Sequence, residues 1–119
     1  DLSDGLASDL WQLARASRAT LQIVERAIPV ARAAQTCLRR ACLCHEWRGR
    51  QATWHALMDG EDFELLVAVP PRAASQVPKT IGRVPITEIG QVTKHGAGVT
   101  LLRTDGRIAP LVPQGFKHF

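Results

Sequence analysis

The apolar run Leu65-Leu66-Val67-Ala68-Val69 limits the possible folds of this 119-residue chain more than any other segment. A continuous apolar run of strand length is typical of a β-strand that is buried on both faces. We therefore predict such a strand over residues 63–69. A strand of this kind lies between layers of other structure, as strands do in domains that pack helices against a sheet.

Helices and strands are predicted to alternate along the rest of the chain. Leu6, Leu10, Leu13 and Ala14 recur at helical spacing and predict a helix over residues 5–17. Alternation of β-branched residues predicts a strand over residues 21–25. Composition and breakers predict helices over 30–47, 50–58 and 70–76, and strands over 86–92 and 99–103. Residues 94–98 are expected to join the last two strands as a hairpin loop, and Asp105-Gly106 to form a tight turn.

This order of elements predicts an α/β (α+β) fold with a mixed sheet flanked by helices. The length of 119 residues fits one domain, 1–119, that can bury a core without covalent staples.

The first residues, Asp1-Leu2-Ser3-Asp4-Gly5-Leu6, place two carboxylates and a hydroxyl just ahead of the predicted first helix. Free N–H groups and the helix dipole favour an anion at such a point. Carboxylates there suit a phosphate only with Mg²⁺ between them, so Asp1 and Asp4 are candidate ligands of Mg²⁺. The plainer interpretation is that Ser and Asp only cap the helix. Because a functional loop rarely stands at a natural terminus, we also expect the chain to be a fragment of a longer protein.

Charge and composition give little support to a nucleic-acid or membrane partner. The formal net charge is +4, and the Lys and Arg residues are spread along the sequence without a block of like charges. Tyr is absent and Phe occurs three times, so no aromatic platform for single strands is predicted. No apolar run approaches the length of a membrane span.

Three cysteines, Cys37, Cys42 and Cys44, lie close to His45. Their odd number argues against a disulfide framework, and their spacing differs from that of zinc sites. We predict buried, reduced, metal-free thiols, which fit a cytoplasmic protein.

A second acidic segment, Asp59-Gly60-Glu61-Asp62-Phe63-Glu64-Leu65-Leu66, stands between a predicted helix and the buried strand. Junctions of this kind at the edge of an open sheet often hold ligands. The alternative is a solvated acidic turn without a ligand.

Four segments resemble motifs of the thiamine-monophosphate kinase family, in the superfamily of aminoimidazole ribonucleotide synthetase and selenophosphate synthetase. The first six residues with Ser8-Asp9-Leu10 are similar to its D-[IL]-S-D-G-L-x-x-D-L. The second acidic segment is similar to its G-E-D-Y-E-L-L. Residues 84–92 and 115–119 resemble its V-P-[VI]-x-x-I-G-x-V and its terminal G-[WY]-x-H-F. The similarity runs from end to end and implies the C-terminal half of such a kinase, with the N-terminal nucleotide-binding half absent from this chain.

The resemblance implies an enzyme that transfers the γ-phosphoryl group of ATP to the phosphate of thiamine monophosphate, forming thiamine diphosphate. It implies that Asp1 and Asp4 bind Mg²⁺, that Ser3 contacts the ATP phosphates, and that Glu61 and Phe116 contact the substrate. No catalytic residue of this chain is implied. The resemblance also implies a fold like the C-terminal domain of aminoimidazole ribonucleotide synthetase and a homodimer formed through the N-terminal half. The fragment alone is expected to be inactive.

Some positions depart from the family pattern. Asp59 stands where the family usually has Gly, which is expected to narrow the substrate loop, and Phe63 and Phe116 replace Tyr or Trp. Two alternatives therefore stay open. In the first, the parent is a degenerate member that acts as a structural or binding domain; in the second, it is a superfamily enzyme with a different acceptor.

Overall fold

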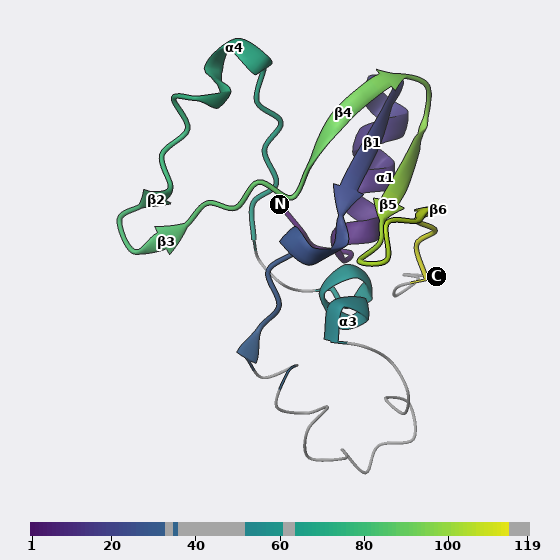
Figure 1. The fold of residues 1–119 in the computed structure, drawn as a ribbon, viewed down its shortest axis with the longest axis horizontal. Helices are drawn as coiled ribbons and strands as arrows, with labels where there is room; N and C mark the ends of the chain where they lie inside the picture. The colour runs from purple at the N-terminus through teal and green to yellow at the C-terminus, as the bar shows by residue number, and fades with distance from the viewer. Residues whose placement is uncertain (33–34, 36–51, 61–63, 115–119) are drawn as a thin grey trace.

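The structure, a computed structural model, describes residues 1–32, 35, 52–60 and 64–114. Its centre is a four-stranded mixed sheet in the strand order β4-β1-β5-β6, with helix α1 packed against one face (Figure 1). The predicted mixed sheet with a flanking helix is confirmed. The strands are β1 Ala19–Val24, β4 Gly90–His95, β5 Gly98–Leu102 and β6 Ile108–Pro110.

Helix α1, Leu6–Ser17, confirms the helix that apolar spacing predicts. It ends at Arg18, which adopts the left-handed conformation (φ 50°) and donates its backbone N–H to the carbonyls of Ala14 and Arg15. One face of the helix is buried against alternate residues of the two central strands, because Leu21 and Ile23 of β1 and Val99 and Leu101 of β5 point the same way. The buried hydrophobic core of the described residues consists of Leu2, Leu6, Ala7, Leu10, Ala14, Leu21, Ile23, Ile28, Leu57, Met58, Val99, Leu101 and Leu111.

The central strand β1 runs antiparallel to β4 and parallel to β5. The predicted hairpin between the last two long strands is therefore wrong. The short connection between β4 and β5 passes over the start of β1, where the N–H of Gly96 donates to the carbonyl of Arg18 at 3.0 Å. Strand β1 thus lies between two strands that follow each other in sequence. The last strand, β6, pairs antiparallel with β5 and was not predicted.

Residues 64–89 project from the sheet as a separate lobe, here called the arm (Figure 1). It contains helix α4, Pro71–Ala74, and a two-stranded pairing of β2, Thr80–Ile81, with β3, Val84–Pro85. The predicted strand at 86–92 is instead β4, which begins only at Gly90.

The predicted doubly buried strand over 63–69 is wrong for the residues that the structure describes. Only Glu64 makes a β-bridge, with Leu2, and Leu65 and Val67 are 79% and 71% exposed. The apolar residues are present in the sequence, but no described part of the chain packs over Leu65 and Val67.

Helix α3, Ala52–Met58, confirms the core of the helix predicted over 50–58. Its buried residues Leu57 and Met58 close the end of the core beside α1. A short 3-10 helix, η1 Glu25–Ala27, follows β1 directly. Most of the helix predicted over 30–47 lies outside the described residues, and so does the whole cluster of Cys37, Cys42, Cys44 and His45. Within the described ranges, no helix is both long and apolar enough to cross a membrane.

Candidate functional site

The first residues form a loop whose backbone is held by Asp9 from the first turn of α1. The carboxylate oxygen Oδ2 of Asp9 accepts the backbone N–H of Ser3 at 3.0 Å and that of Asp4 at 3.3 Å. A carboxylate that accepts two N–H groups fixes a tight loop, and such charge-assisted bonds are stronger than neutral ones. Asp9 therefore anchors the loop, and these two N–H groups bind a side chain of the protein rather than a free anion.

The plain capping interpretation of the first residues is wrong. The N-cap of α1 is Gly5, and no side chain makes a capping hydrogen bond there. Ser3 and Asp4 lie before the cap.

The loop is closely packed against the turn that follows α3. A Cβ added to Gly5 would lie 2.9 Å from the carbonyl oxygens of Met58 and Asp59, and one added to Gly60 would lie 2.8 Å from the carbonyl oxygen of Ser3. At these distances only a hydrogen atom fits, so both contacts require glycine. The backbone N–H of Leu2 also donates to the carbonyl of Glu64 at 2.9 Å.

These contacts bring the two acidic segments of the sequence together. Gly60 and Glu64 both touch the first loop, and they flank Glu61, Asp62 and Phe63, which lie outside the described residues. The predicted substrate residue Glu61 thus belongs to a segment whose two ends are anchored on the loop that carries Asp1, Ser3 and Asp4.

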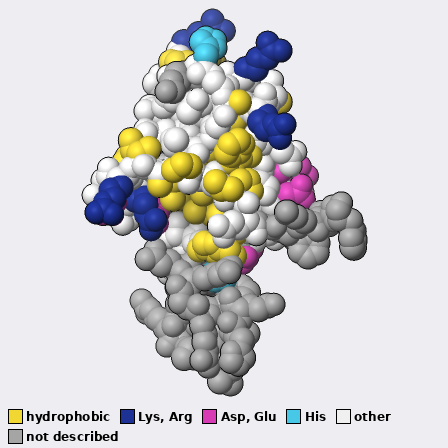
Figure 2. Space-filling model, turned by 90° about the vertical axis from the view of Figure 1, so that its right-hand side faces the viewer, with side chains coloured by type: hydrophobic (Ala, Val, Ile, Leu, Met, Phe, Trp, Pro, Cys, Tyr) yellow, Lys and Arg dark blue, Asp and Glu magenta, His cyan; other side chains and the backbone are white. Residues whose placement is uncertain are grey.

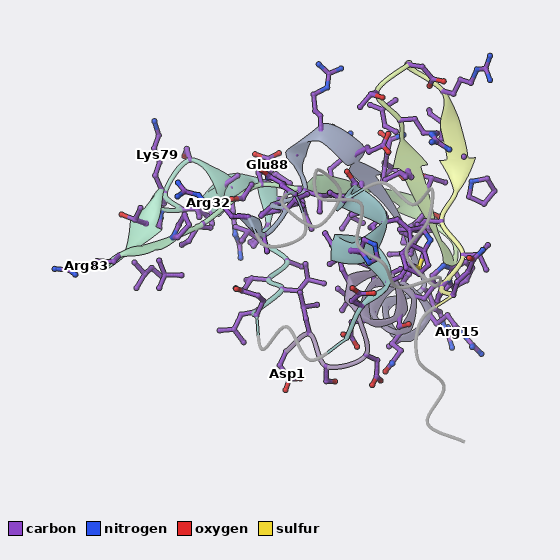
Figure 3. All side chains as sticks on the ribbon, turned by 90° about the horizontal axis from the view of Figure 1, so that it is seen from below. Asp1, Arg15, Arg32, Lys79, Arg83 and Glu88 are labelled. Carbon is purple, nitrogen blue, oxygen red and sulfur yellow. The ribbon has the colours of Figure 1, made fainter. Side chains whose placement is uncertain are left out.

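Of the predicted ligand residues, Asp1 and Ser3 are exposed and Asp4 is half-buried. The side-chain amide Nε2 of Gln12, on α1, donates to Oδ2 of Asp4, eight residues earlier in the first loop, at 3.4 Å. Figure 3 shows Asp1 at the periphery of the molecule, apart from Lys79 and Arg83 on the arm and from Arg15 on α1.

The fit of these residues to a metal rests on their chemistry. The loop offers two carboxylates and a hydroxyl, which are the hard oxygen donors that Mg²⁺ takes, and Mg²⁺ usually needs only one or two carboxylates beside substrate phosphates. Within residues 1–32, 35, 52–60 and 64–114, no three His, Cys, Asp or Glu side chains form a group able to hold a metal by themselves. The donor set therefore suits a metal shared with a phosphate and not a closed protein site.

Asp59, the departure from the family pattern, is paired with a histidine of α3. Its Oδ2 lies 3.1 Å from Nδ1 of His55, which is buried and stands one turn earlier on the helix. The ring of Trp54 meets the His55 ring edge-on at a centroid distance of 5.2 Å. The Asp59 carboxylate is thus directed back toward α3 and closes its last turn.

The described residues that precede the predicted aromatic contact bind to α1 and α3. Indole Nε1 of Trp11 donates to the carbonyl of Leu111, and the N–H of Gln114 lies 3.3 Å from the sulfur of Met58. Phe116 itself lies outside the described residues. Gln114 thus lies at the end of α3, where the backbone of Met58 packs against Gly5.

The sequence interpretation missed Asp9 and His55 as organisers of the site. Asp9 was part of the recognised motif, and an acidic residue in the first turn of a helix is a signal that was available. His55 carried no comparable signal, because its partner is identified only by the helical spacing of four residues to Asp59.

Comparisons with known proteins give a consistent answer. No family model matches the sequence. The chain is 34% identical over 121 residues to the thiamine-monophosphate kinase of Bacillus subtilis, covering 100% of this chain and 34% of that protein. It is 35% identical over 121 residues to the thiamine-monophosphate kinase of Escherichia coli K12, covering 100% of this chain and 34% of that protein. It is 32% identical over 118 residues to the thiamine-monophosphate kinase of Rhodopirellula baltica, covering 99% of this chain and 35% of that protein.

A solved structure, AaThiL complexed with AMPPCP and TMP, superposes with a TM-score of 0.71 at 30% identity, covering 100% of this chain and 32% of the other. The chain has the mixed α/β fold of the aminoimidazole ribonucleotide synthetase type. More particularly, it matches the thiamine-monophosphate kinase family over its whole length. It spans about one third of the length of these relatives, and not the half that the motifs predicted.

Proposed function

We propose that this chain is part of a kinase that transfers the γ-phosphoryl group of ATP to the phosphate of thiamine monophosphate, forming thiamine diphosphate. The observation that carries the proposal is the match of the whole chain, in sequence and fold, to a structure complexed with AMPPCP and TMP. AMPPCP is an analogue of ATP, and TMP in a protein of this family corresponds to thiamine monophosphate.

The first loop would hold the metal and the phosphates. Asp1 and Asp4 would bind Mg²⁺, and the hydroxyl of Ser3 would contact a phosphate of ATP. When bound, the metal neutralises the phosphate oxygens, which is the main requirement of phosphoryl transfer together with alignment of the acceptor. The task of the chain is to keep these oxygen donors in place. The support for this assignment is that Asp9 binds the loop backbone on one side and the glycine contacts fix it on the other.

The second acidic segment and the tail would contact the acceptor. Glu61 would accept a hydrogen bond from the aminopyrimidine or offset the charge of the thiazolium. Phe116 would stack on a heteroaromatic ring, an arrangement that also favours a cation. Both assignments come from the family motif. They are supported by the contacts of Gly60 and Glu64 with the first loop and by the contact of Gln114 with Met58, which packs against that loop.

The remaining features of the proposal concern the whole protein. It would act in the cytoplasm as a homodimer formed through the N-terminal part, with no nucleic-acid or membrane partner. The 119-residue chain alone would form no thiamine diphosphate, because residues that act as a unit lose nearly all activity when part of the unit is missing.

The test is the substitution Asp4→Asn in the full-length parent, with Asp105→Asn as the matched control. Asp105 is exposed and accepts the N–H of Arg107 in a turn far from the loop, so its substitution removes the same charge elsewhere. We expect Asp4→Asn to lower turnover by a factor of ~100 or more, as loss of an electrostatic contact to the transition state does. Its melting temperature should change little. Equal turnover of the two variants would show that Asp4 does not hold the metal.

A second variant tests the acceptor. Phe116→Ala should raise the KM for thiamine monophosphate about tenfold, since aromatic stacking on a base contributes roughly 1–3 kcal/mol. The KM for ATP should stay the same. A full-length parent that binds thiamine monophosphate without turnover would instead be a binding protein, and turnover only with another phosphorylated acceptor would identify a different superfamily enzyme.

A further inference from the structure

Helix α1 presents two polar side chains to the first loop, and they hold different parts of it. Asp9 accepts the backbone N–H groups of Ser3 and Asp4, at 3.0 and 3.3 Å. Gln12 contacts a side chain instead, because its amide Nε2 donates to Oδ2 of the Asp4 carboxylate at 3.4 Å. Asp4 is therefore held twice by α1, once through its main chain and once through the group that is the candidate metal ligand.

The geometry of α1 places both of its residues for this task. Residues three apart share one face of a helix, and a rise of about 1.5 Å per residue puts Gln12 about 4.5 Å beyond Asp9. Helical side chains lean toward the N-terminus of their helix, which directs the long side chain of Gln12 back toward the loop. The Asp4 carboxylate, eight residues earlier in the sequence, thus lies against the flank of α1.

Charge distinguishes Gln12 from the basic residues that are common in this chain. The chain has 15 Lys and Arg residues and a formal net charge of +4, and the face viewed in Figure 2 carries an apolar area bordered by Lys and Arg. A cation that paired with Asp4 would compete with a metal for the same carboxylate. The amide of Gln12 is a donor without charge. It fixes the direction of the carboxylate and leaves its negative charge for a metal.

We propose that Gln12 is a positioning residue of the first loop, which orients the Asp4 carboxylate toward Mg²⁺. An ionised carboxylate has roughly four acceptor sites, so the bond to Oδ2 leaves positions for a metal. Mg²⁺ demands nearly ideal octahedral geometry, and carboxylates that bind metals are in turn held by hydrogen bonds from the residues around them. The inference rests on the proposed function, because it takes Asp4 as a ligand of Mg²⁺.

The experiment measures Mg²⁺ binding without turnover in the full-length parent. Each variant is mixed with AMPPCP, and its melting temperature is followed as Mg²⁺ is added. The Mg²⁺ concentration that gives half of the stabilisation, here called the Mg²⁺ midpoint, reports the metal affinity. Gln12→Met keeps the length of the side chain and removes the donor. We expect it to raise the Mg²⁺ midpoint about tenfold, as loss of a hydrogen bond to a metal ligand does.

The melting temperature without Mg²⁺ and a matched substitution show whether the effect is only structural. Gln12 is exposed, so Gln12→Met should leave the melting temperature of the metal-free protein unchanged. Gln76→Met makes the same change at an exposed residue of the arm and should alter neither quantity. A lower metal-free melting temperature with an unchanged Mg²⁺ midpoint in Gln12→Met would overturn the inference, because Gln12 would then make a structural contact only.

A double variant tests whether Gln12 acts through Asp4. Asp4→Asn should raise the Mg²⁺ midpoint by more than Gln12→Met does, and adding Gln12→Met to it should raise the midpoint no further. Additive effects would overturn the inference, since Gln12 would then act apart from Asp4. A raised midpoint in Asp4→Asn with an unchanged one in Gln12→Met would overturn the inference and leave the proposed function standing. An unchanged midpoint in Asp4→Asn would overturn both, because Asp4 would hold no metal.

Discussion

The contact between the first loop and the turn after α3 predicts that glycine-to-alanine substitutions, each of which adds one methyl group, destabilise the chain by different amounts. Gly5 adopts φ 91° and ψ 147°, and a Cβ there would also lie 2.9 Å from two carbonyl oxygens. A non-glycine residue in such a conformation costs about 1–3 kcal/mol. Overpacking of a closed contact adds roughly 1–3 kcal/mol. Gly5→Ala should therefore destabilise the chain by about 2–6 kcal/mol, a large part of the roughly 5–15 kcal/mol that holds a typical domain folded.

Three other glycines distinguish the cost of the backbone conformation from the cost of overpacking. Gly60 has an ordinary φ but a contact at 2.8 Å, Gly106 has φ 86° with open space around it, and Gly98 in β5 has neither constraint. Gly60→Ala should thus cost about 1–3 kcal/mol from packing alone. Gly106→Ala should cost about 1–2 kcal/mol from conformation alone, and Gly98→Ala should be neutral or slightly stabilising.

The assay is urea unfolding of the four variants followed by circular dichroism, with thermal melting as a second measure. Replacing glycine by alanine lowers the conformational entropy of the unfolded chain by a similar amount in all four variants. This contribution therefore cancels when the variants are compared with one another. The expected order of destabilisation is Gly5 first, then Gly60 and Gly106, then Gly98. If Gly60→Ala unfolds at the same urea concentration as Gly98→Ala, the two acidic segments are not in close contact and the site described above is not formed.

Three further predictions use the same unfolding assay. Asp9→Ala should lose about 1.5–3 kcal/mol, because two backbone N–H groups lose a charged acceptor, while Asp9→Asn should lose less; equal loss would mean that the charge does not matter. Trp11→Phe should cost about 1–3 kcal/mol by leaving the carbonyl of buried Leu111 without its donor, and a neutral result would argue against that bond. Glu25→Ala should cost about 1–3 kcal/mol, because the N–H of Thr104 donates to Glu25 at 3.0 Å, and Glu25→Gln, which keeps an acceptor, should recover most of it.

Local patterns predicted the elements that local contacts determine. The apolar spacing of α1 gave its bounds to within a residue, because one helical stripe packs on one sheet face. Strand β1 was also found from its alternation, shifted by one or two residues. The neighbours of β1 could not be predicted in the same way. The chain passes directly from β4 to β5, yet β1 separates them, and only long-range pairing decides that order.

The run at 65–69 shows the opposite case, in which the pattern was clear and the structure did not fulfil it. Leu66 is partly buried against the core, while Leu65 and Val67 are exposed, so the predicted strand buried on both faces is not formed. A strand that is buried on both faces requires other elements to cover each face. The apolar pattern of the sequence indicates this burial but does not identify the covering elements. Among the described residues, the segment makes a single β-bridge, between Leu2 and Glu64.

The candidate site contains two kinds of residue: those that hold the first loop in place and those that would bind a ligand. Asp9 accepts the loop N–H groups, and Gly5 and Gly60 allow the backbones to meet, so the loop keeps its shape without using the side chains of Asp1 or Ser3. Motif recognition marks both kinds of residue equally, since both are fixed in the pattern. Only the geometry separates them, and the separation has a measurable consequence. Substituting Asp9 or Gly5 should change stability and function together, whereas substituting Asp1 or Ser3 should change function alone.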